Sequence, residues 1–358
     1  MASLERLIEG WAGECVVVRY DAPSGSWIFI AIHDRTLGMA MGGCRMRVYP
    51  GPADGLLDAM RLAEGMTLKW AGLEFPLGGG KAVLAVPRPL DGAERHGLLL
   101  RFGDLVEGLG GLYATGVDLG TTPADMNVVG RRTDRVAGRL PEAGGAGDPG
   151  PWTALGVYEG MRAAAAHLFG QPDLAGRRVL VQGVGGVGRP LALRLREAGA
   201  EVVIADASEE RSCAVAAELG VDRVPVDAVY GTECDIFAPC AIGAVLNAGT
   251  VPSLRCRIVA GSANNQLEED ADADRLADRG ILYLPDFVVN AGGAVAHGIL
   301  EILGGVEADV EPLVRRIGPT ITGVLEESES RGETPLAAAV RRARRHISER
   351  RGHAVAPE

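Results

Sequence analysis

Hydrophobic positions in the first part of the chain follow two different periods. Short apolar or alternating runs, bounded by polar residues, predict strands at Cys15 to Val18, Trp27 to Ile32 and Ala82 to Val86. Between the second and third runs, apolar residues recur with helical spacing from about Ala53 to Trp70. This part of the chain is therefore predicted to be α/β.

The following part alternates predicted strands and helices. Thr153 is expected to cap a helix whose apolar positions are Val157, Met161, Ala164, Ala165 and Leu168. Strands are then predicted at residues 179–181, 202–205, 236–238, 257–260 and 281–284, and helices at residues 190–198 and 208–219. Strands joined through helices run parallel, because a parallel pair needs a crossover connection. The pattern predicts a doubly wound parallel sheet.

Two amphipathic helices are predicted near the end of the chain, over residues 310–325 and 335–350. The polar face of the second helix carries a basic run formed by Arg341, Arg342, Arg344, Arg345, Arg350 and Arg351. Such a run usually forms a solvated face, and an anion-binding surface is the alternative. We expect this terminal segment, about residues 335–358, to pack back on the first part of the chain.

A glycine- and proline-rich segment separates the two parts. Gly144 to Pro151 reads GGAGDPGP, and regular structure is not expected to continue through it. A chain of 358 residues suits two domains. We place the boundary inside this segment, which gives domains of residues 1–147 and 148–334 joined by a hinge.

Composition and charge exclude several classes of protein. The chain is 47% hydrophobic and 23% charged, which matches a globular rather than a disordered protein. Its net charge of −11 argues against a nucleic-acid partner. The apolar stretch at residues 236–254 contains glycines and prolines that a membrane-spanning helix would not readily carry.

The cysteines and the N-terminal residues indicate a cellular compartment. Glu5 and Glu9 interrupt the region where a secretory signal would be continuously apolar. The six cysteines have irregular spacings and include no CxxC pair, as is typical of thiols in a reducing cytosol. We therefore expect a cytoplasmic protein with no disulfide framework and no metal site.

A glycine motif, GVGGVG, follows the predicted strand at residues 179–181 and precedes a helix. Such motifs bind dinucleotides: the first glycine permits a tight turn, the second lets the backbone approach a pyrophosphate, and the third lets the helix pack on the strand. Free N–H groups at the helix N-terminus add an anion site. We expect Gly183, Gly185, Gly186, Val187 and Gly188 to bind the cofactor in a Rossmann-type fold, the alternative being an ordinary turn.

Asp206 ends the next apolar run, eighteen residues beyond Gly188. A carboxylate at this point can accept both ribose hydroxyls of an adenosine and repels a 2′-phosphate, which favours NAD over NADP. Two alternatives remain open. Asp206 could cap the helix expected at Ser208, and Arg211 could partly accommodate a phosphate.

Lys69 and Lys81 are the only lysines in the chain. Lys69 ends the predicted helix at residues 53–70, and Lys81 follows the three glycines Gly78 to Gly80 ahead of a strand. A lone lysine is usually a solvated surface charge. Here arginine serves at every other basic position, so the two lysines are expected to provide what a guanidinium cannot, namely loss of a proton near neutral pH.

The motifs together resemble those of the glutamate, leucine, phenylalanine and valine dehydrogenases, nearest the phenylalanine, leucine and valine branch. The resemblance covers nearly the whole chain. Its motifs are MGGCR (residues 41–45), MTLK (66–69), LGGGK (77–81), DLGTT (118–122), the GVGGVG turn, APC (238–240), ANNQ (263–266) and PDFVVNAGG (285–293).

The resemblance implies reversible, NAD-dependent oxidative deamination of an apolar L-amino acid to its 2-oxo acid and ammonia. The resemblance implies that Lys81 is the general base, that Asp118 binds the substrate amino group, and that Lys69 binds the substrate carboxylate. A neighbouring cation would favour the neutral form of Lys81. The fold implied is α/β, with a substrate and oligomerisation domain, a Rossmann-type NAD-binding domain and a cleft between them that closes at the hinge. A homo-oligomer is expected.

The remaining site residues also come from the resemblance. The cofactor's nicotinamide and ribose are expected near Ala238, Pro239, Cys240 and Asn264. The substrate is expected near Gly42, Asn264 and Asn290, with its side chain among Met41, Gly116, Ala294 and His297.

The identity of the substrate depends on the side-chain positions. Met41 stands where a glutamate enzyme carries a lysine, so glutamate is disfavoured. Small residues at Gly116 and Ala294 enlarge the space, which favours phenylalanine over leucine or valine, while tyrosine and tryptophan stay open. His297 and Val117 depart from the family pattern; His297 could fill the space, stack on a ring, bond a polar substituent or point elsewhere. A non-catalytic NAD-binding regulator is the alternative from another class.

Overall fold

The computed structural model describes residues 8–355 and divides into two compact units. Unit 1 contains residues 8–147, His297–Glu307 and residues 343–355, and unit 2 contains Asp148–Ala296 and Ala308–Arg342. The first crossing lies within the expected hinge segment. The return of residues 297–307 to unit 1 departs from the continuous range 148–334 expected for the second domain. Glu5 and residues 356–358 lie outside the described residues.

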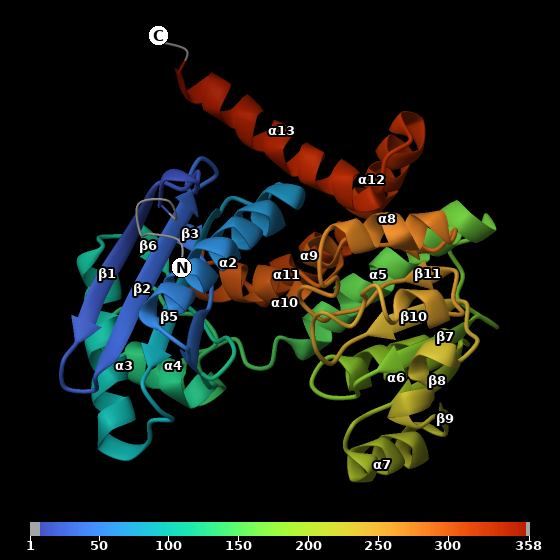
Figure 1. Ribbon diagram of the computed structural model, residues 1–358, viewed down its shortest axis with the longest axis horizontal. Helices are drawn as coiled ribbons and strands as arrows, with labels where there is room; N and C mark the ends of the chain where they lie inside the picture. The colour runs from blue at the N-terminus through green and yellow to red at the C-terminus, as the bar shows by residue number, and fades with distance from the viewer. Residues whose placement is uncertain (1–7, 356–358) are drawn as a thin grey trace. The chain divides into compact units, whose positions relative to one another are not determined.

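Unit 1 is built on a six-stranded sheet in the order β1-β2-β5-β3-β6, with β4 also paired to β5 (Figure 1). Its strands are β1 (Cys15–Asp21), β2 (Ser26–Asp34), β3 (Ala40–Met41), β4 (Cys44–Val48), β5 (Gly78–Val86) and β6 (Tyr113–Ala114). β1 and β2 form an antiparallel hairpin, and β2 also pairs antiparallel with β5. The short strands β3 and β4 run parallel to β5, one after the other along the same strand.

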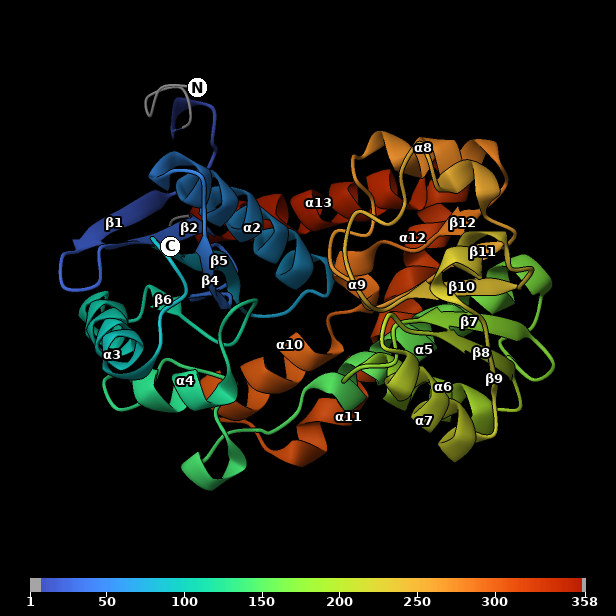
Figure 2. The ribbon, with the colours of Figure 1, turned by 60° about the horizontal axis from the view of Figure 1, so that its bottom comes forward.

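Helices cover both faces of this sheet, because alternate residues of its strands point to opposite sides. Phe29 and Ala31 of β2 pack under α2 (Pro52–Gly72). Ile30 of the same strand packs on the other face, in a cluster with Phe102 of α3 (Gly92–Gly108) and Met126 of α4 (Pro123–Val129). Figure 2 shows α2 and α3 on opposite sides of the sheet. Burial on both sides explains why β2 and β5 are almost uniformly apolar.

β5 corrects one prediction about the glycines. The sequence predicted a strand from Ala82, with Gly78 to Lys81 preceding it, but the strand begins at Gly78 and is buried along its whole length. A Cβ at Gly79 would overlap the Thr67 side chain and backbone of α2, and one at Gly80 would lie 2.9 Å from the Tyr113 ring. The glycines are therefore strand residues that other chain segments approach closely.

Unit 2 contains the parallel sheet that the alternating pattern predicted. Its order is β12-β11-β10-β7-β8-β9, and every neighbouring pair is parallel. The strands are β7 (Arg178–Gln182), β8 (Glu201–Ala205), β9 (Asp222–Arg223), β10 (Ile236–Pro239), β11 (Ile258–Val259) and β12 (Leu282–Tyr283). The chain reverses its direction of progress between β7 and β10, which is the ligand-binding edge of doubly wound sheets.

The helices of unit 2 are α5 (Gly150–Phe169), α6 (Gly188–Glu197), α7 (Glu209–Leu219), α8 (Ala271–Asp278), α9 (Asp286–Val289), α11 (Glu307–Arg315) and α12 (Ile317–Arg331), of which α11 starts at the unit boundary. α6 packs on β7 and β8 and beside α5. The opposite face, around Leu180, Val203 and Phe237, is covered by α8 and by the 3₁₀ turns Val226–Gly231 and Val251–Ser253.

Two helix boundaries differ from the sequence prediction. α5 begins at Gly150 rather than after Thr153. Pro151 is compatible with this earlier start, because a proline is tolerated in the first turn of a helix. Thr153 lies inside α5, and its hydroxyl contacts the Pro149 carbonyl at 3.1 Å. Instead of the single helix expected at residues 310–325, the structure has two helices. Pro319 has no N–H to donate to the Arg315 carbonyl four residues before it, and the proline ring clashes with that carbonyl.

Helical segments from the later part of the chain also belong wholly or partly to unit 1. α10 (Gly292–His297) reaches unit 1 at its last residue and continues into a π-helix, Gly298–Ile302. α13 (Pro335–Val355) begins in unit 2, where Leu336 packs against the core cluster. Its later residues Ala343 and Ile347 pack against Ala71 of α2.

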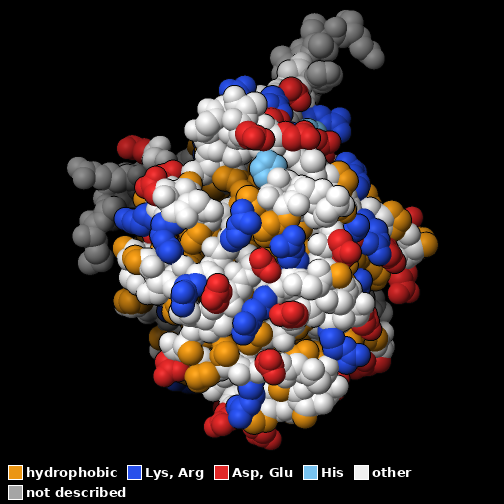
Figure 3. Space-filling view, turned by 90° about the vertical axis from the view of Figure 1, so that its right-hand side faces the viewer, with side chains coloured by type: hydrophobic (Ala, Val, Ile, Leu, Met, Phe, Trp, Pro, Cys, Tyr) orange, Lys and Arg blue, Asp and Glu red, His pale blue; other side chains and the backbone are white. Residues whose placement is uncertain are grey.

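Charges are dispersed over the surface. The face in Figure 3 carries basic and acidic side chains side by side. In the expected basic run, Arg341 and Arg342 pair with Glu327, and Arg351 pairs with Asp34 at 2.5 Å. No helix within residues 8–355 combines the length and the apolar composition required to cross a bilayer.

Candidate functional site

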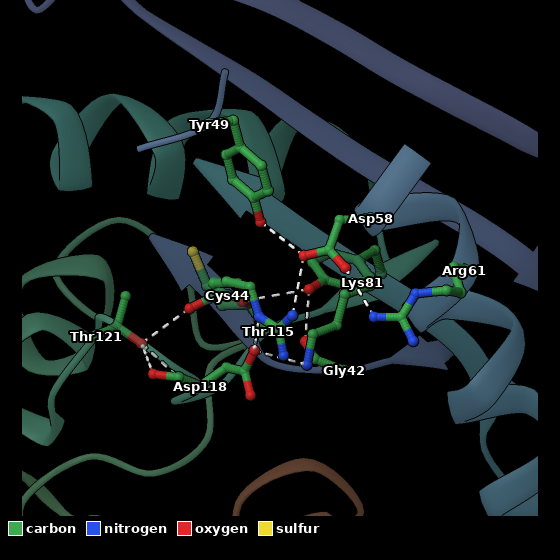
Figure 4. A network of polar contacts seen from close by, with 11 residues as sticks. Gly42, Cys44, Tyr49, Asp58, Arg61, Lys81, Thr115, Asp118 and Thr121 are labelled. Atoms are coloured by element: carbon green, nitrogen blue, oxygen red, sulfur yellow. Dashed lines mark hydrogen bonds and ion pairs between the residues drawn. The ribbon is translucent and has the colours of Figure 1, made fainter. Parts of the chain in front are cut away.

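Lys81 and Asp118 form an ion pair inside unit 1. Lys81 stands in the middle of β5, and Asp118 follows β6 in the loop before α4. The lysine Nζ lies 3.2 Å from Asp118 Oδ2, and the two side chains are 7% and 19% exposed (Figure 4). The structure therefore brings together the two residues predicted to be catalytic, and it shields both from bulk water.

The loop that carries Asp118 is held by the neighbouring threonines. The Thr121 hydroxyl accepts the Asp118 backbone N–H at 3.0 Å and donates to the Cys44 carbonyl at 2.9 Å. Thr122 and Asp125 form a capping box at the start of α4. Arg95 of α3 binds that Asp125 carboxylate through two nitrogens, at 2.9 and 2.7 Å. The Asp118 backbone is thus anchored to two helices and a strand.

Arg45 is a functional candidate that the sequence analysis did not assign. Its Nε donates to Asp118 Oδ2 at 3.0 Å, and its Nη1 donates to Asp58 Oδ2 at 2.9 Å. The same Asp58 oxygen accepts the Tyr49 hydroxyl at 2.7 Å (Figure 4). Burial would raise the pKa of Asp118, but Lys81 and Arg45 outweigh it and hold that pKa below its ordinary value.

Glycines allow the strands around this pair to approach closely. A Cβ at Gly42 would overlap the Gly80 carbonyl oxygen, and the Gly42 carbonyl accepts the Tyr113 hydroxyl at 2.5 Å. Met41 is buried on β3, and its carbonyl accepts the Trp70 indole N–H at 3.1 Å. Lys69 stands in the last turn of α2 and is half-buried.

His297 and Gly116 also belong to unit 1. The His297 ring lies with Nε2 3.3 Å from the Gly147 carbonyl oxygen, to which it donates when Nε2 carries the proton. A Cβ at Gly138 would lie 3.4 Å from His297 Cε1 and 2.9 Å from Val117 Cγ2, so both side chains lie close to Gly138. The buried Gly116 accepts the Cys44 N–H at 2.7 Å. The hydrogen bond to Gly147 thus matches one of the alternatives for His297, in which the ring points away from the substrate side chain.

The glycine turn of unit 2 connects β7 to α6. Gly183 has φ +93°, and a Cβ at Gly188 would overlap the Gly183 carbonyl. A Cβ at Gly186 would meet no atom within 4 Å, and one at Gly185 only Arg211 Nη1 at 4.0 Å. The first and third glycines are required by the turn itself, and open space lies beside the middle two at the N-terminus of α6. This arrangement fits a pyrophosphate.

Asp206 follows β8 and faces the same turn. Its Oδ2 accepts the Val184 N–H at 2.9 Å, and its Oδ1 accepts the Ser208 N–H at 2.8 Å. The side-chain cap of α7 comes from Ser208, whose hydroxyl accepts the Arg211 N–H at 3.2 Å. Arg211 Nη1 lies 3.5 Å from Asp206 Oδ2. Asp206 therefore organises the turn, and its carboxylate has an arginine beside it.

Unit 2 also carries the other residues expected at the cofactor and two of those expected at the substrate. Ala238 and Pro239 end β10, and Cys240 follows and donates its backbone N–H to Gln182 of β7 at 2.8 Å. Asn290 Nδ2 donates to Asn264 Oδ1 at 2.8 Å. Ala294 of α10 is half-buried between the buried residues Gly293 and Val295. Ala238, Pro239 and Cys240 therefore border the reversal point between β7 and β10.

Comparisons with known proteins agree with this architecture. Residues 24–135 match the family description Glu/Leu/Phe/Val dehydrogenase, dimerisation domain, and residues 205–310 match Glutamate/Leucine/Phenylalanine/Valine dehydrogenase. A leucine dehydrogenase of Bacillus cereus is 41% identical over 341 residues, which cover 95% of this chain and 92% of that protein. The chain belongs to the Glu/Leu/Phe/Val dehydrogenase family.

Other members of the Glu/Leu/Phe/Val dehydrogenase family are about as similar. A valine dehydrogenase of Streptomyces albus is 43% identical over 345 residues, covering 94% of this chain and 93% of that protein. The solved L-tryptophan dehydrogenase of Nostoc punctiforme is 36% identical with a TM-score of 0.86, covering 98% of this chain and 100% of that chain. The predicted family and the two-domain α/β fold are confirmed. The protein is an amino-acid dehydrogenase that depends on a pyridine nucleotide.

Proposed function

We propose that the protein catalyses reversible, NAD-dependent oxidative deamination of an apolar L-amino acid to its 2-oxo acid and ammonia. The observation that carries the proposal is the buried pair of Lys81 and Asp118, with Nζ 3.2 Å from Oδ2. An amine that can release its proton, held beside a carboxylate, is suited to moving protons to and from water and an amino group.

In this proposal, residues of unit 1 have separate roles in the reaction. Lys69 binds the substrate carboxylate, and Asp118 holds the amino group and exchanges a proton with it. A bound nicotinamide would supply the acceptor for the hydride that leaves the substrate Cα. Lys81 then takes a proton from the water that attacks the resulting imino acid, and ammonia leaves. Closure at the Gly144–Pro151 hinge would exclude bulk water from these steps.

The proposal assigns unit 1 to the substrate and to oligomerisation, and unit 2 to the cofactor. The match of residues 24–135 to a domain described as a dimerisation domain supports a homo-oligomer. All six cysteines are free thiols, which suits a reducing cytosol. Light scattering on the purified protein measures the number of subunits.

NAD is the proposed cofactor, because the Asp206 carboxylate stands beside the glycine turn. We expect Asp206→Asn to weaken NAD binding about tenfold, since a charge-assisted hydrogen bond to ribose is lost. Isothermal titration with NAD and with NADP measures both affinities without turnover. The ratio of the NAD affinity to the NADP affinity should be smaller in Asp206→Asn than in wild type.

The control for this prediction is Ser208→Ala. That substitution removes the hydroxyl cap of α7, which typically costs about 1 kcal/mol of stability, and leaves the Asp206 carboxylate in place. It should leave the preference for NAD unchanged. Equal NAD affinities for wild type and Asp206→Asn would show that Asp206 serves only the turn.

The proposed substrate is a branched-chain amino acid, leucine or valine, with an aromatic amino acid as the second candidate. Met41 is apolar and buried, so it offers no charge to a glutamate side chain. The sequence analysis placed phenylalanine first, but the leucine and valine dehydrogenases among the relatives favour the branched-chain class. The tryptophan dehydrogenase structure and the ring of His297 support the aromatic candidate.

The test is a panel of L-amino acids incubated with the purified protein and NAD at alkaline pH, with NADH absorbance as the readout. We expect the highest kcat/KM with leucine or valine. A preference for phenylalanine, tyrosine or tryptophan would replace the branched-chain assignment by the aromatic one. Absence of NADH production with every amino acid, together with measurable NAD binding, would favour a non-catalytic regulator.

A further inference from the structure

One oxygen of Asp118 serves two cations. Its Oδ2 lies 3.2 Å from Lys81 Nζ and 3.0 Å from Arg45 Nε. A carboxylate this close to a lysine favours the charged ammonium form, which cannot accept a proton. The sequence analysis assigned the opposing effect to a neighbouring cation, and the cation bonded to Asp118 besides Lys81 is Arg45. Its side chain is only 14% exposed, so solvent screens it weakly.

We propose that Arg45 is a positioning residue for the reaction, which holds Asp118 in place and neutralises its charge so that Lys81 can lose its proton and act as base. The inference rests on the proposed function and adds a residue to it. Arg45 suits this role because a guanidinium stays protonated throughout the working range of an enzyme.

Asp58 of α2 limits how far Arg45 neutralises the charge of Asp118. It accepts a hydrogen bond from Arg45 Nη1 at 2.9 Å, so Arg45 lies between two carboxylates and joins them through two edges of its planar group. Tyr49 and Arg61 bond the Asp58 carboxylate at 2.7 and 2.9 Å and fix it in turn. Removing the charge of Asp58 should therefore act on Lys81 in the direction opposite to removing Arg45.

Other titratable groups around the pair are neutral or already paired. Burial raises the pKa of the Cys44 thiol on β4 and of the Tyr113 phenol on β6, so both stay uncharged. Asp125 of α4 is bound by Arg95 of α3 at 2.7 Å. Lys69, at the end of α2, is the other lysine of the unit and is assigned to the substrate.

The test compares pH profiles of kcat/KM for deamination by four variants and wild type. Arg45→Gln should move the acid limb to higher pH by about one unit, with activity recovering above it, because the ammonium form of Lys81 is favoured. Arg45→Lys should show only part of this shift, since it keeps the positive charge but lacks the second edge of the guanidinium. Asp58→Asn should move the limb to lower pH. Arg88→Gln, an exposed arginine paired with Glu94, is the matched control.

A second readout does not need turnover. Because Lys69 and Lys81 are the only lysines, protein labelled with ¹³C at lysine Cε yields two lysine signals, which Lys69→Arg assigns. The Lys81 signal should titrate at higher pH in Arg45→Gln and at lower pH in Asp58→Asn. An equal loss of activity at every pH, or an unmoved Lys81 titration, would overturn the inference. Lack of deamination by wild type would overturn the proposed function and leave this titration to decide the inference.

Discussion

Lys81→Ala is expected to lower kcat/KM for oxidative deamination by about a thousandfold, within the range that general base catalysis contributes. The side chain is buried on β5 and lies 3.2 Å from Asp118, so no mobile surface group can replace it. NADH production in the presence of the best amino acid measures the loss. NAD binding, measured by titration, should remain within about twofold of wild type, because the cofactor motif belongs to unit 2.

Lys81→Arg distinguishes a base from a simple ion pair. Arginine keeps the positive charge opposite Asp118, but it does not release a proton in the working range. We expect Lys81→Arg to be as inactive as Lys81→Ala. Activity of Lys81→Arg within about tenfold of wild type would mean that the charge alone suffices and that Lys81 is not the base.

Gly79→Ala is expected to destabilise the protein by about 4 kcal/mol or more, which would prevent accumulation of folded protein. The added methyl group would overlap Thr67 Oγ1 and the Thr67 backbone N–H, and would lie 2.6 Å from Thr67 Cα. Turning the Thr67 hydroxyl away would not relieve the overlap, because the Thr67 backbone N–H and Cα of α2 lie just as close to β5. Soluble yield and thermal unfolding measure the effect.

Gly65→Ala is the matched control for this substitution. It lies on α2, two residues before Thr67, and its added methyl group would meet no atom within 4 Å. An alanine in a helix is favoured over glycine by up to about 1 kcal/mol, so this variant should be slightly more stable than wild type. A folded, stable Gly79→Ala protein would show that α2 can move away from β5.

The Rossmann unit was predictable from the sequence because its signals are local. The strand, glycine turn and helix at residues 178–197 follow each other directly, and Asp206 ends the next strand. Each of these features is decided by neighbouring residues, such as the turn that Gly183 makes with φ +93°. The order of the strands then follows from parallel pairing.

Unit 1 was less predictable because its contacts are distant in the sequence. Arg45 and Asp118 are 73 residues apart, and no spacing connects them. The short strands β3 and β4 are too brief to show a period, although their MGGCR motif was noticed through family resemblance. The return of residues 297–307 to unit 1 depends on contacts such as that of Glu301 with the Gly138 N–H at 2.8 Å. These features depend on contacts between residues that are far apart in the sequence, and no local sequence pattern indicates them.

The placement of α13 has a consequence for biosynthesis. Ala343 and Ile347 cover Ala71, and Arg351 binds both Asp34 and Thr36, so a helix translated after unit 2 completes the packing of the first unit. A nascent chain that has just left the ribosome with residues 8–147 lacks this cover. The packing of unit 1 can therefore be completed only after unit 2 has been synthesised, although most of unit 1 is translated first.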